Sequence, residues 1–288
     1  MLSWIWFIVA SSIFGAIAMV FKKKALSKAH TVEYLFAFKP LELAFLLLFL
    51  PFIVFKIDFH IVLFMFLLSL LTSVALIYIA KSYKHMELSM IAPLHNLMPL
   101  FVIVLAVFLL GESISYKHFA GIGLLLAGTY YLESEHHLSD WKTPFKKLKS
   151  KYVLFLLFGF LLSSLIAVSE KWIISSVSPF TLLFYHYSFQ SFNFIMLSTF
   201  VYGGFKDLKH AYKTSWKNLL GNAFFANISN LLYFFAISLT FISLAAPVRR
   251  LSSLFAIFLS GRFLHEGRIM HKTFACAIML AGVFIIAL

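Results

Sequence analysis

The sequence has few charged residues, and its acidic residues are fewer than its basic residues. Charged side chains make up 12% of the 288 residues and hydrophobic side chains 62%, whereas a soluble domain usually carries about 25% charged residues. This composition excludes an ordinary soluble protein and indicates an integral membrane protein. The 24 Lys and Arg residues outnumber the 11 Asp and Glu residues, but they cluster in short segments. Such clusters are typical of topology signals and of contact with anionic membrane lipids, so nucleic acid is not expected as a partner.

Several kinds of functional motif are also missing from the sequence. The single cysteine, Cys276, excludes an internal disulfide. The sequence has no His-Glu-x-x-His motif, no cysteine cluster and no glycine-rich phosphate loop, so we expect neither a metal site nor direct use of ATP. We therefore predict a protein that has no cofactor and is not an enzyme. No basic residue precedes the first apolar run and no cleavage site follows it, which predicts a retained helix instead of a signal peptide.

Long apolar runs fill the chain. They are close to 20 residues each, the length of a transmembrane helix and about twice that of a transmembrane strand. The most polar segment, 134–151, is predicted to be a basic linker between two five-helix repeats, 1–133 and 152–288. The sequence thus predicts an all-α integral membrane protein whose ten transmembrane helices cover residues 2–21, 32–55, 61–82, 88–110, 115–133, 152–175, 179–202, 217–239, 242–263 and 270–288.

The two halves of the chain resemble each other. A shift of 154 residues gives 13 identities over the 40 positions from 89 to 128, and a shift of 148 residues aligns the first helices of the halves. Five is an odd number, so a second set of five helices has the opposite orientation. Inverted repeats with a binding site at their interface are the architecture of secondary transporters. The aligned residues include Pro93 with Pro247, Glu112 with Glu266, Lys23 with Lys171 and Glu42 with Gln190.

Two adjacent arginines, Arg249 and Arg250, lie inside the apolar run 242–263. One such charge at membrane depth costs roughly 2.5–3.5 kcal/mol on insertion scales, so the pair is expected to meet an anion. A planar guanidinium suits carboxylate and phosphate oxygens, which favours an anionic substrate as the partner. The alternative is an internal ion pair with Glu42 or Glu170.

The repeat register places His95 and Asn96 in the positions that correspond to the two arginines. Each pair follows a proline by two and three positions, and proline loosens a helix and frees carbonyl groups. If both helices line a central cavity, the pairs face each other across it. A protonated His95 would then add a donor for the anion, so we expect low pH to tighten binding through His95.

The segment 89–132 resembles the EamA domain of the drug/metabolite transporter superfamily. It shares an Ala-Pro start, Pro99, the Gly-Glu pair at 111–112 and the glycines at 121 and 128, and the segment 243–288 resembles a second copy. This resemblance implies a ten-helix carrier whose central cavity is lined largely by its third, fourth, eighth and ninth helices.

Within that superfamily, triose-phosphate translocators have a Lys-Arg pair in the ninth helix that contacts the substrate phosphate. Arg249 and Arg250 are similar to this pair in type and position. Basic residues of the fourth helix have a related role there, and His95 stands in a comparable place. The resemblance therefore also implies an anionic substrate.

Other polar side chains lie within the predicted helices. Lys39 and Glu42 are three residues apart on one helical face, where we expect a mutual ion pair; a gating or coupling role is the alternative. His186 is interpreted as a packing histidine. Asparagines inside membranes often join helices, but we also consider a substrate-binding role for four side chains of the eighth and third helices: Asn227, Asn230, Tyr233 and Tyr78.

The basic residues also predict the orientation of the chain in the membrane. Loops after the odd-numbered helices carry 17 Lys and Arg residues, and loops after the even-numbered helices carry 3. Loops rich in Lys and Arg stay in the cytoplasm, which predicts a multi-pass protein of the inner (plasma) membrane with both termini outside the cytoplasm. The resemblance argues for the opposite orientation, since many relatives have cytoplasmic termini; we favour the charge count.

Together these features predict a secondary active transporter that moves a small organic anion, a phosphorylated or carboxylated metabolite, by alternating access through a central cavity. Exchange, as in an antiporter, or an ion gradient would supply the energy. An exporter of amino acids or amphipathic drugs is one alternative, and a membrane protein or enzyme that binds lipid phosphate is another. Membrane lipids are the expected surroundings of a monomer or a homodimer.

Overall fold

The computed structural model describes residues 3–26, 31–85, 94, 97–133, 150–201, 205–252, 254–256, 259 and 269–287. All regular structure in these ranges is helical. The predicted linker, except its last two residues, and the pair His95-Asn96 lie outside them. Five of the described helices are long and apolar enough to cross a bilayer.

The helices follow the apolar runs closely, because each run ends at a charged or turn-forming segment. Two elements differ from the prediction. The long helix α10 begins about 12 residues before the predicted start, in a polar stretch, and its backbone breaks at Ser215. Helix α11 ends at Val248, and Arg249 and Arg250 form a turn within the run 242–263. The described elements are α1 Ser3–Leu26, α2 Thr31–Leu46, the 3-10 helix η1 Leu47–Phe52, α3 Phe59–His85, α5 Leu97–Leu110, α6 Tyr116–Glu133, α8 Lys151–Ile173, α9 Pro179–Val201, α10 Phe205–Leu239, α11 Ile242–Val248 and α13 Ile269–Ala287.

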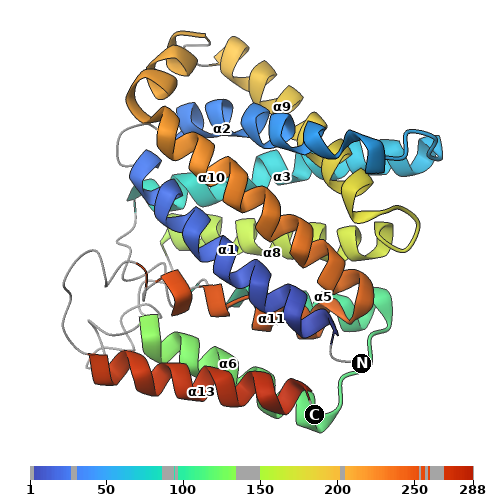
Figure 1. Ribbon diagram of the computed structural model, residues 1–288, viewed down its shortest axis with the longest axis vertical. Helices are drawn as coiled ribbons and strands as arrows, with labels where there is room; N and C mark the ends of the chain where they lie inside the picture. Colours follow the sequence, from blue (N-terminus) through green and yellow to red (C-terminus); the bar gives the residue numbers. More distant parts are fainter. Residues whose placement is uncertain are drawn as a thin grey trace.

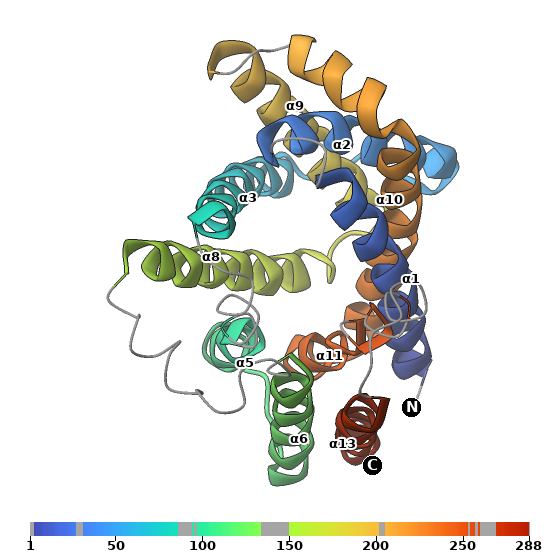
Figure 2. The same ribbon diagram turned by 90° about the vertical axis from the view of Figure 1, so that its left-hand side faces the viewer.

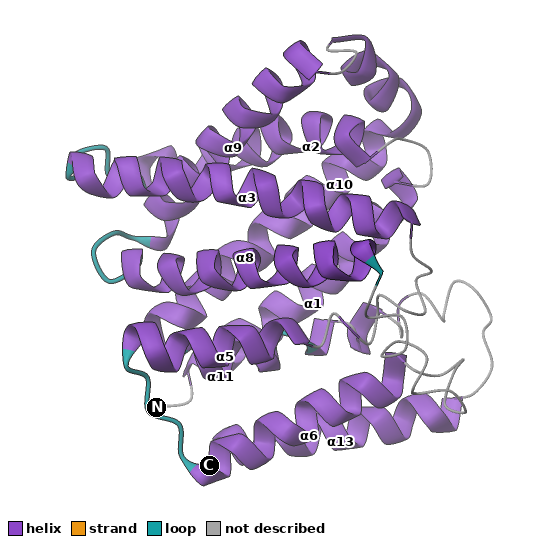
Figure 3. Cartoon of the chain, turned by 180° about the vertical axis from the view of Figure 1, so that it is seen from behind, coloured by secondary structure: helices purple, strands orange, loops and turns teal. Residues whose placement is uncertain are grey.

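Successive helices cross the bundle in alternating directions (Figures 1 and 3). One end of the bundle, the linker end, holds the last turns of α1 and α6 and the first turn of α8. The opposite end, the termini end, holds both ends of the chain (Figure 1). Helix α1 packs along α10, α3 along α8, and α2 against both α9 and α10, while α5 contacts α8 and α11. Helices α6 and α13 pack together at one side of this group (Figure 2).

Small residues allow two of these helix pairs to approach closely. Ser11 of α1 and Ser229 of α10 each donate a hydroxyl hydrogen bond to the other's carbonyl, at 2.7 and 2.8 Å. In the second pair, a methyl group on Gly159 of α8 would lie 3.2 Å from the carbonyl oxygen of Ala75 on α3. A shift of 148 residues places Ser11 on Gly159, and a shift of 154 residues places Ala75 on Ser229.

Glycines also set the distance between α6 and α13. A Cβ atom on Gly121 would lie 2.8 Å from the Gly282 carbonyl oxygen, and a Cβ atom on Gly282 would lie 2.7 Å from the Gly121 carbonyl oxygen. Both contacts are with backbone, which cannot rotate away as a side chain can. Gly123, on the same helix α6, has nothing within 4 Å of its Cβ position.

We therefore predict opposite effects for alanine at these glycines. Gly121→Ala and Gly282→Ala should each destabilise the protein by roughly 1–3 kcal/mol, the usual cost of overpacking. Gly123→Ala, the matched control, should be neutral or stabilising, since alanine favours helix over glycine by about 1 kcal/mol. Thermal unfolding of the purified variants in detergent measures these effects. Equal stability of all three variants would show that α6 and α13 are not in backbone contact.

Candidate functional site

A cavity of about 410 Å³ lies between the helices, and a second cavity of about 290 Å³ adjoins it. They share five lining residues, so we treat them as one central cavity; the shared residues are Lys39, Leu76, Asn230, Arg249 and Ser252. The larger volume is in the range of about 300–1,000 Å³ that small-molecule sites occupy. Besides the helices expected from the resemblance, α1, α2, α8 and α9 contribute to the wall.

The wall of the central cavity is more basic than acidic. Among the described lining residues, four are cationic and two are carboxylates, a formal surplus of two positive charges. The exposed side chain of Lys22 lies near the linker end of α1, and Glu170 lies near the opposite end of α8. The cavity thus extends along much of the bundle. The charged residues are Lys22, Lys39, Arg249, Arg250, Glu42 and Glu170.

The position of Arg249 depends on how the short helix α11 begins. The Glu112 carboxylate, just beyond α5, accepts hydrogen bonds from the amides of Ile242 and Ser243 at 2.9 and 3.0 Å, and from the Ser243 hydroxyl. A carboxylate satisfies the free N–H groups of a helix N-terminus and complements its dipole. Glu112 therefore fixes the start of α11, and Arg249 follows directly after its last residue.

A lysine side chain stabilises the turn between α10 and α11, which precedes the start of α11. The Lys171 ammonium of α8 donates hydrogen bonds to the carbonyl oxygens of Ile237 and Thr240, the second at 2.8 Å. These carbonyls lie at the C-terminal end of α10, where cations are favourable. Lys171 and Glu112 together hold the turn between α10 and α11; we call this arrangement the turn clasp.

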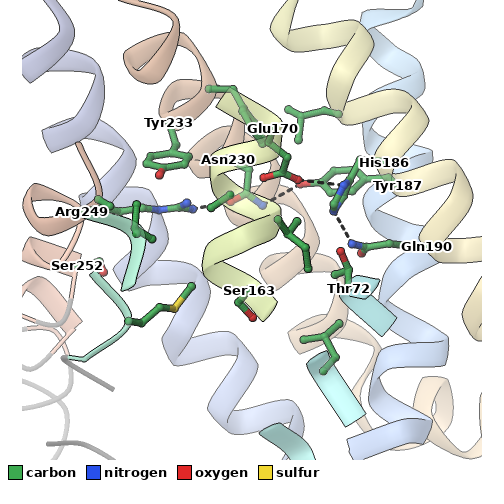
Figure 4. Close-up of a pocket in the computed structure, with 18 of the residues that line it drawn as sticks. Thr72, Ser163, Glu170, His186, Tyr187, Gln190, Asn230, Tyr233, Arg249 and Ser252 are labelled. Atoms are coloured by element: carbon green, nitrogen blue, oxygen red, sulfur yellow. Dashed lines mark hydrogen bonds and ion pairs between the residues drawn. The ribbon is translucent and has the colours of Figure 1, made fainter. Parts of the chain in front are cut away.

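The Arg249 guanidinium points into the cavity and contacts α10 (Figure 4). Its Nη2 donates to Asn230 Oδ1 at 2.6 Å, and its central carbon lies 4.0 Å from the centroid of the Tyr233 ring. Asn230 in turn donates to the Tyr187 hydroxyl of α9 at 2.8 Å. Arg249 makes no salt bridge within 4.0 Å to a carboxylate of the described residues. Its neighbours hold the guanidinium in place without neutralising its charge.

The predicted ion pair of helix α2 is confirmed. Lys39 Nζ lies 2.7 Å from Glu42 Oε2, and 12% and 3% of the two side chains are exposed. Asn227 of α10 donates to the backbone carbonyl of Glu42 at 3.2 Å and to that of Ala223 at 2.8 Å. Asn227 thus joins α2 to α10.

A second ionisable pair lies in the cavity, between α8 and α9. His186 Nδ1 is 3.1 Å from Glu170 Oε1, and the other ring nitrogen contacts the amide nitrogen of Gln190 (Figure 4). All three side chains line the cavity, so His186 does more than fill space between helices. The repeat provided a signal for this group, since the shift of 148 residues aligns Lys22 with Glu170 and Glu42 with Gln190.

The structure brings together only some of the predicted site residues. Arg249, Arg250, Asn230, Tyr233, Lys39 and Glu42 line the central cavity. Asn227 is not among the lining residues, because its amide is used between helices. Tyr78 also lies elsewhere: its ring packs edge-on against Phe155 and Phe158 of α8, at 5.2 Å from each. His95 and Asn96 lie outside the described residues.

The Lys39–Glu42 pair provides a test of this geometry. Removing one partner leaves a buried charge uncompensated, so Lys39→Met and Glu42→Gln should each destabilise the protein by roughly 3–5 kcal/mol. The double variant should recover part of the loss, because neither charge remains. Thermal unfolding of the three variants measures the coupling, with Lys117→Met, at an exposed residue outside the cavity, as the control. Single losses that simply add would show that the pair contributes nothing.

Comparison with known proteins identifies the fold and the family. No curated protein sequence matches the chain. Among the solved structures, 28 chains match; one, described only as "Crystal structure of protein", superposes with a TM-score of 0.75 at 13% sequence identity and covers 98% of this chain and 96% of its own. The sequence profile of the EamA-like transporter family matches residues 2–133 and 150–288. The two segments include nearly the whole chain, which therefore belongs to the EamA-like transporter family.

Proposed function

We propose that this family member is a secondary active transporter that carries a small organic anion, phosphorylated or carboxylated, by alternating access through the central cavity. The observation that carries the proposal is the uncompensated guanidinium of Arg249. Neither carboxylate of the cavity contacts the Arg249 guanidinium directly: Glu42 pairs with Lys39, and Glu170 lies 3.1 Å from His186 and attracts Arg249 only over a longer distance. A buried charge without a counter-ion is costly, and an anionic substrate would remove that cost.

The surroundings of Arg249 suit recognition of a carboxylate or phosphate group. Asn230 and Tyr233 fix the guanidinium on one side, so little conformational freedom is lost when its remaining N–H groups bind a ligand. Arg250 lines the same cavity and Lys39 lies across it on α2. Each charge-assisted hydrogen bond contributes roughly 1.5–3 kcal/mol, enough for a site of moderate affinity that can also release its ligand.

The packing at the two bundle ends supports alternating access. At the termini end, Phe180 of α9 stacks on Phe52 of η1 and meets Phe235 of α10 edge-on, at 5.2 and 5.6 Å. Phe235 stacks on Phe7 of α1 at 5.9 Å. This aromatic cluster joins helices of both halves and would close the termini end. Towards the linker end, the cavity reaches the exposed ammonium of Lys22.

Contacts between helices support ten membrane-crossing helices arranged as two inverted repeats, 1–133 and 152–288, joined by the linker 134–151. Exchanging the repeats exchanges α1 with α8 and α3 with α10. The pair α1–α10 then becomes α8–α3, and the pair α2–α10 becomes α9–α3; all four pairs are in contact. Rocking of one repeat against the other would open the cavity to each side in turn.

The same proposal includes the orientation of the chain in the inner membrane. Basic residues concentrate at the linker end, so that end would face the cytoplasm and both termini would lie outside. The arrangement of the aromatic cluster and Lys22 would then correspond to a cavity open to the cytoplasm.

Substitution of the arginines tests the anion site. Arg249→Gln and Arg250→Gln should each weaken anion binding by about one to two orders of magnitude, since each removes charge-assisted hydrogen bonds of roughly 1.5–3 kcal/mol. Arg249→Lys should restore binding only in part, because lysine keeps the charge and loses the planar fork. Calorimetry on purified protein, after a thermal-shift screen of phosphorylated sugars, carboxylates, amino acids and cations, measures these affinities.

Lys117→Gln is the matched control, since it removes one positive charge from an exposed residue outside the cavity. It should bind the anion as the wild type does. Binding and transport unchanged by both arginine substitutions, or a screen that finds only cations, would disprove the anion proposal. Amino acids as the only ligands would favour the exporter, and tightly held phospholipid would favour a lipid-phosphate binder.

Cysteine labelling tests the orientation. In a Cys276→Ser background, a cysteine in place of Lys56, at the termini end, should react in intact cells with a membrane-impermeant reagent. A cysteine in place of Ser139, in the linker, should react only after permeabilisation. The reverse pattern would place the termini in the cytoplasm.

A further inference from the structure

We propose that Glu170 and His186 form a proton-binding site through which anion movement is coupled to a proton. This inference rests on the proposed anion transport for its purpose, although proton binding itself can be measured without a substrate. The pair lies inside the central cavity on α8 and α9, and Arg249 lies on the opposite wall (Figure 4). Only 11% of the Glu170 side chain and 13% of the His186 side chain are exposed.

Gln190 can accommodate both protonation states of the histidine. In a neutral imidazole, Nδ1–H donates to Glu170 and Nε2 accepts from the Gln190 amide N–H, which agrees with the observed contacts. In an imidazolium, Nε2 also donates and needs an acceptor. Gln190 Oε1 is buried and has no hydrogen-bond partner in the part of the chain that the structure describes. Rotation of the amide by 180° would present this oxygen to Nε2–H.

The charges around the pair explain how an anion would affect its proton. Lys39 of α2 and Arg249 and Arg250 of the α11 segment line the same cavity, and the lining residues of α3 and α5 are not ionisable. Glu42 is paired with Lys39. Before an anion binds, the positive charge of Arg249 opposes the arrival of a proton. An anion at Arg249 offsets that charge, so a proton binds more readily once the anion is present.

Linkage makes this effect reciprocal. If the anion increases proton affinity, the proton increases anion affinity by the same factor, and such couplings are typically about 5- to 150-fold. Anion and proton would then bind together and cross the membrane together. A carboxylate and an imidazole that share one proton suit this role, because such a pair binds and releases the proton as a unit.

The first experiment measures the proton without any ligand. Infrared difference spectra of the full-length protein between about pH 8 and 5 should contain carboxyl and imidazole bands that disappear in both Glu170→Gln and His186→Gln. His210→Gln is the matched control, since His210 pairs with Glu33 outside the cavity and 58% of its side chain is exposed. Carboxyl bands that persist in Glu170→Gln and His186→Gln would overturn the proposal.

The second experiment measures coupling with sulfate, whose charge is constant over this pH range. The ratio of the sulfate Kd at high pH to that at low pH should be roughly tenfold in the wild type and less than about twofold in Glu170→Gln and His186→Gln. His210→Gln should keep the wild-type ratio. Loss of the ratio in His95→Ala, with the ratio kept in Glu170→Gln and His186→Gln, would assign the proton to His95 and overturn the proposal. If sulfate does not bind but both substitutions remove the infrared bands, the proton site stands and the anion site fails.

Discussion

The cost of placing a charge inside a membrane bundle explains much of this structure. Lys39 meets Glu42, and Glu170 meets His186, within distances that allow ion pairing or hydrogen bonding. Glu112 and Lys171 instead meet the free amides and carbonyls of helix ends. Each contact joins two turns or two helices, so satisfying the charges also determines where the helices lie. Arg249 differs because a side-chain amide and an aromatic ring surround it, and the proposed anion site rests on that difference.

Close helix contacts lie beside the cavity. Ser11 of α1 and Ser229 of α10 join their helices through hydrogen bonds and also line the cavity, and Gly159 lets α8 approach α3. The rest of the cavity wall includes longer charged and polar side chains of α2, α8, α9 and α10. The aromatic cluster at the termini end is not among the lining residues; separation of its rings would open a path to that end.

The fold was largely predictable from the sequence because helix length and loop charge are local properties. The apolar runs correctly located the described helices, and the three-residue spacing of Lys39 and Glu42 correctly predicted their ion pair. The facing direction of other side chains was harder to predict. Helices that are apolar on all sides carry little information about which face meets the cavity, so Tyr78 was expected there and instead packs on α8. The contacts of His186 with Glu170 and Gln190 require α8 and α9 to lie side by side, which sequence spacing alone does not reveal.

The turn clasp has a mechanical consequence. Glu112 belongs to the first half of the chain and α11 to the second, so any rotation between the halves is applied at the first residues of α11. Helix α11 has seven residues and is therefore about 10 Å long. A rotation of about 10° at its clasped end would displace the guanidinium end by about 2 Å, enough to break a hydrogen bond. A change in the tilt of the halves would therefore also move the Arg249 guanidinium, because the turn clasp holds the other end of α11.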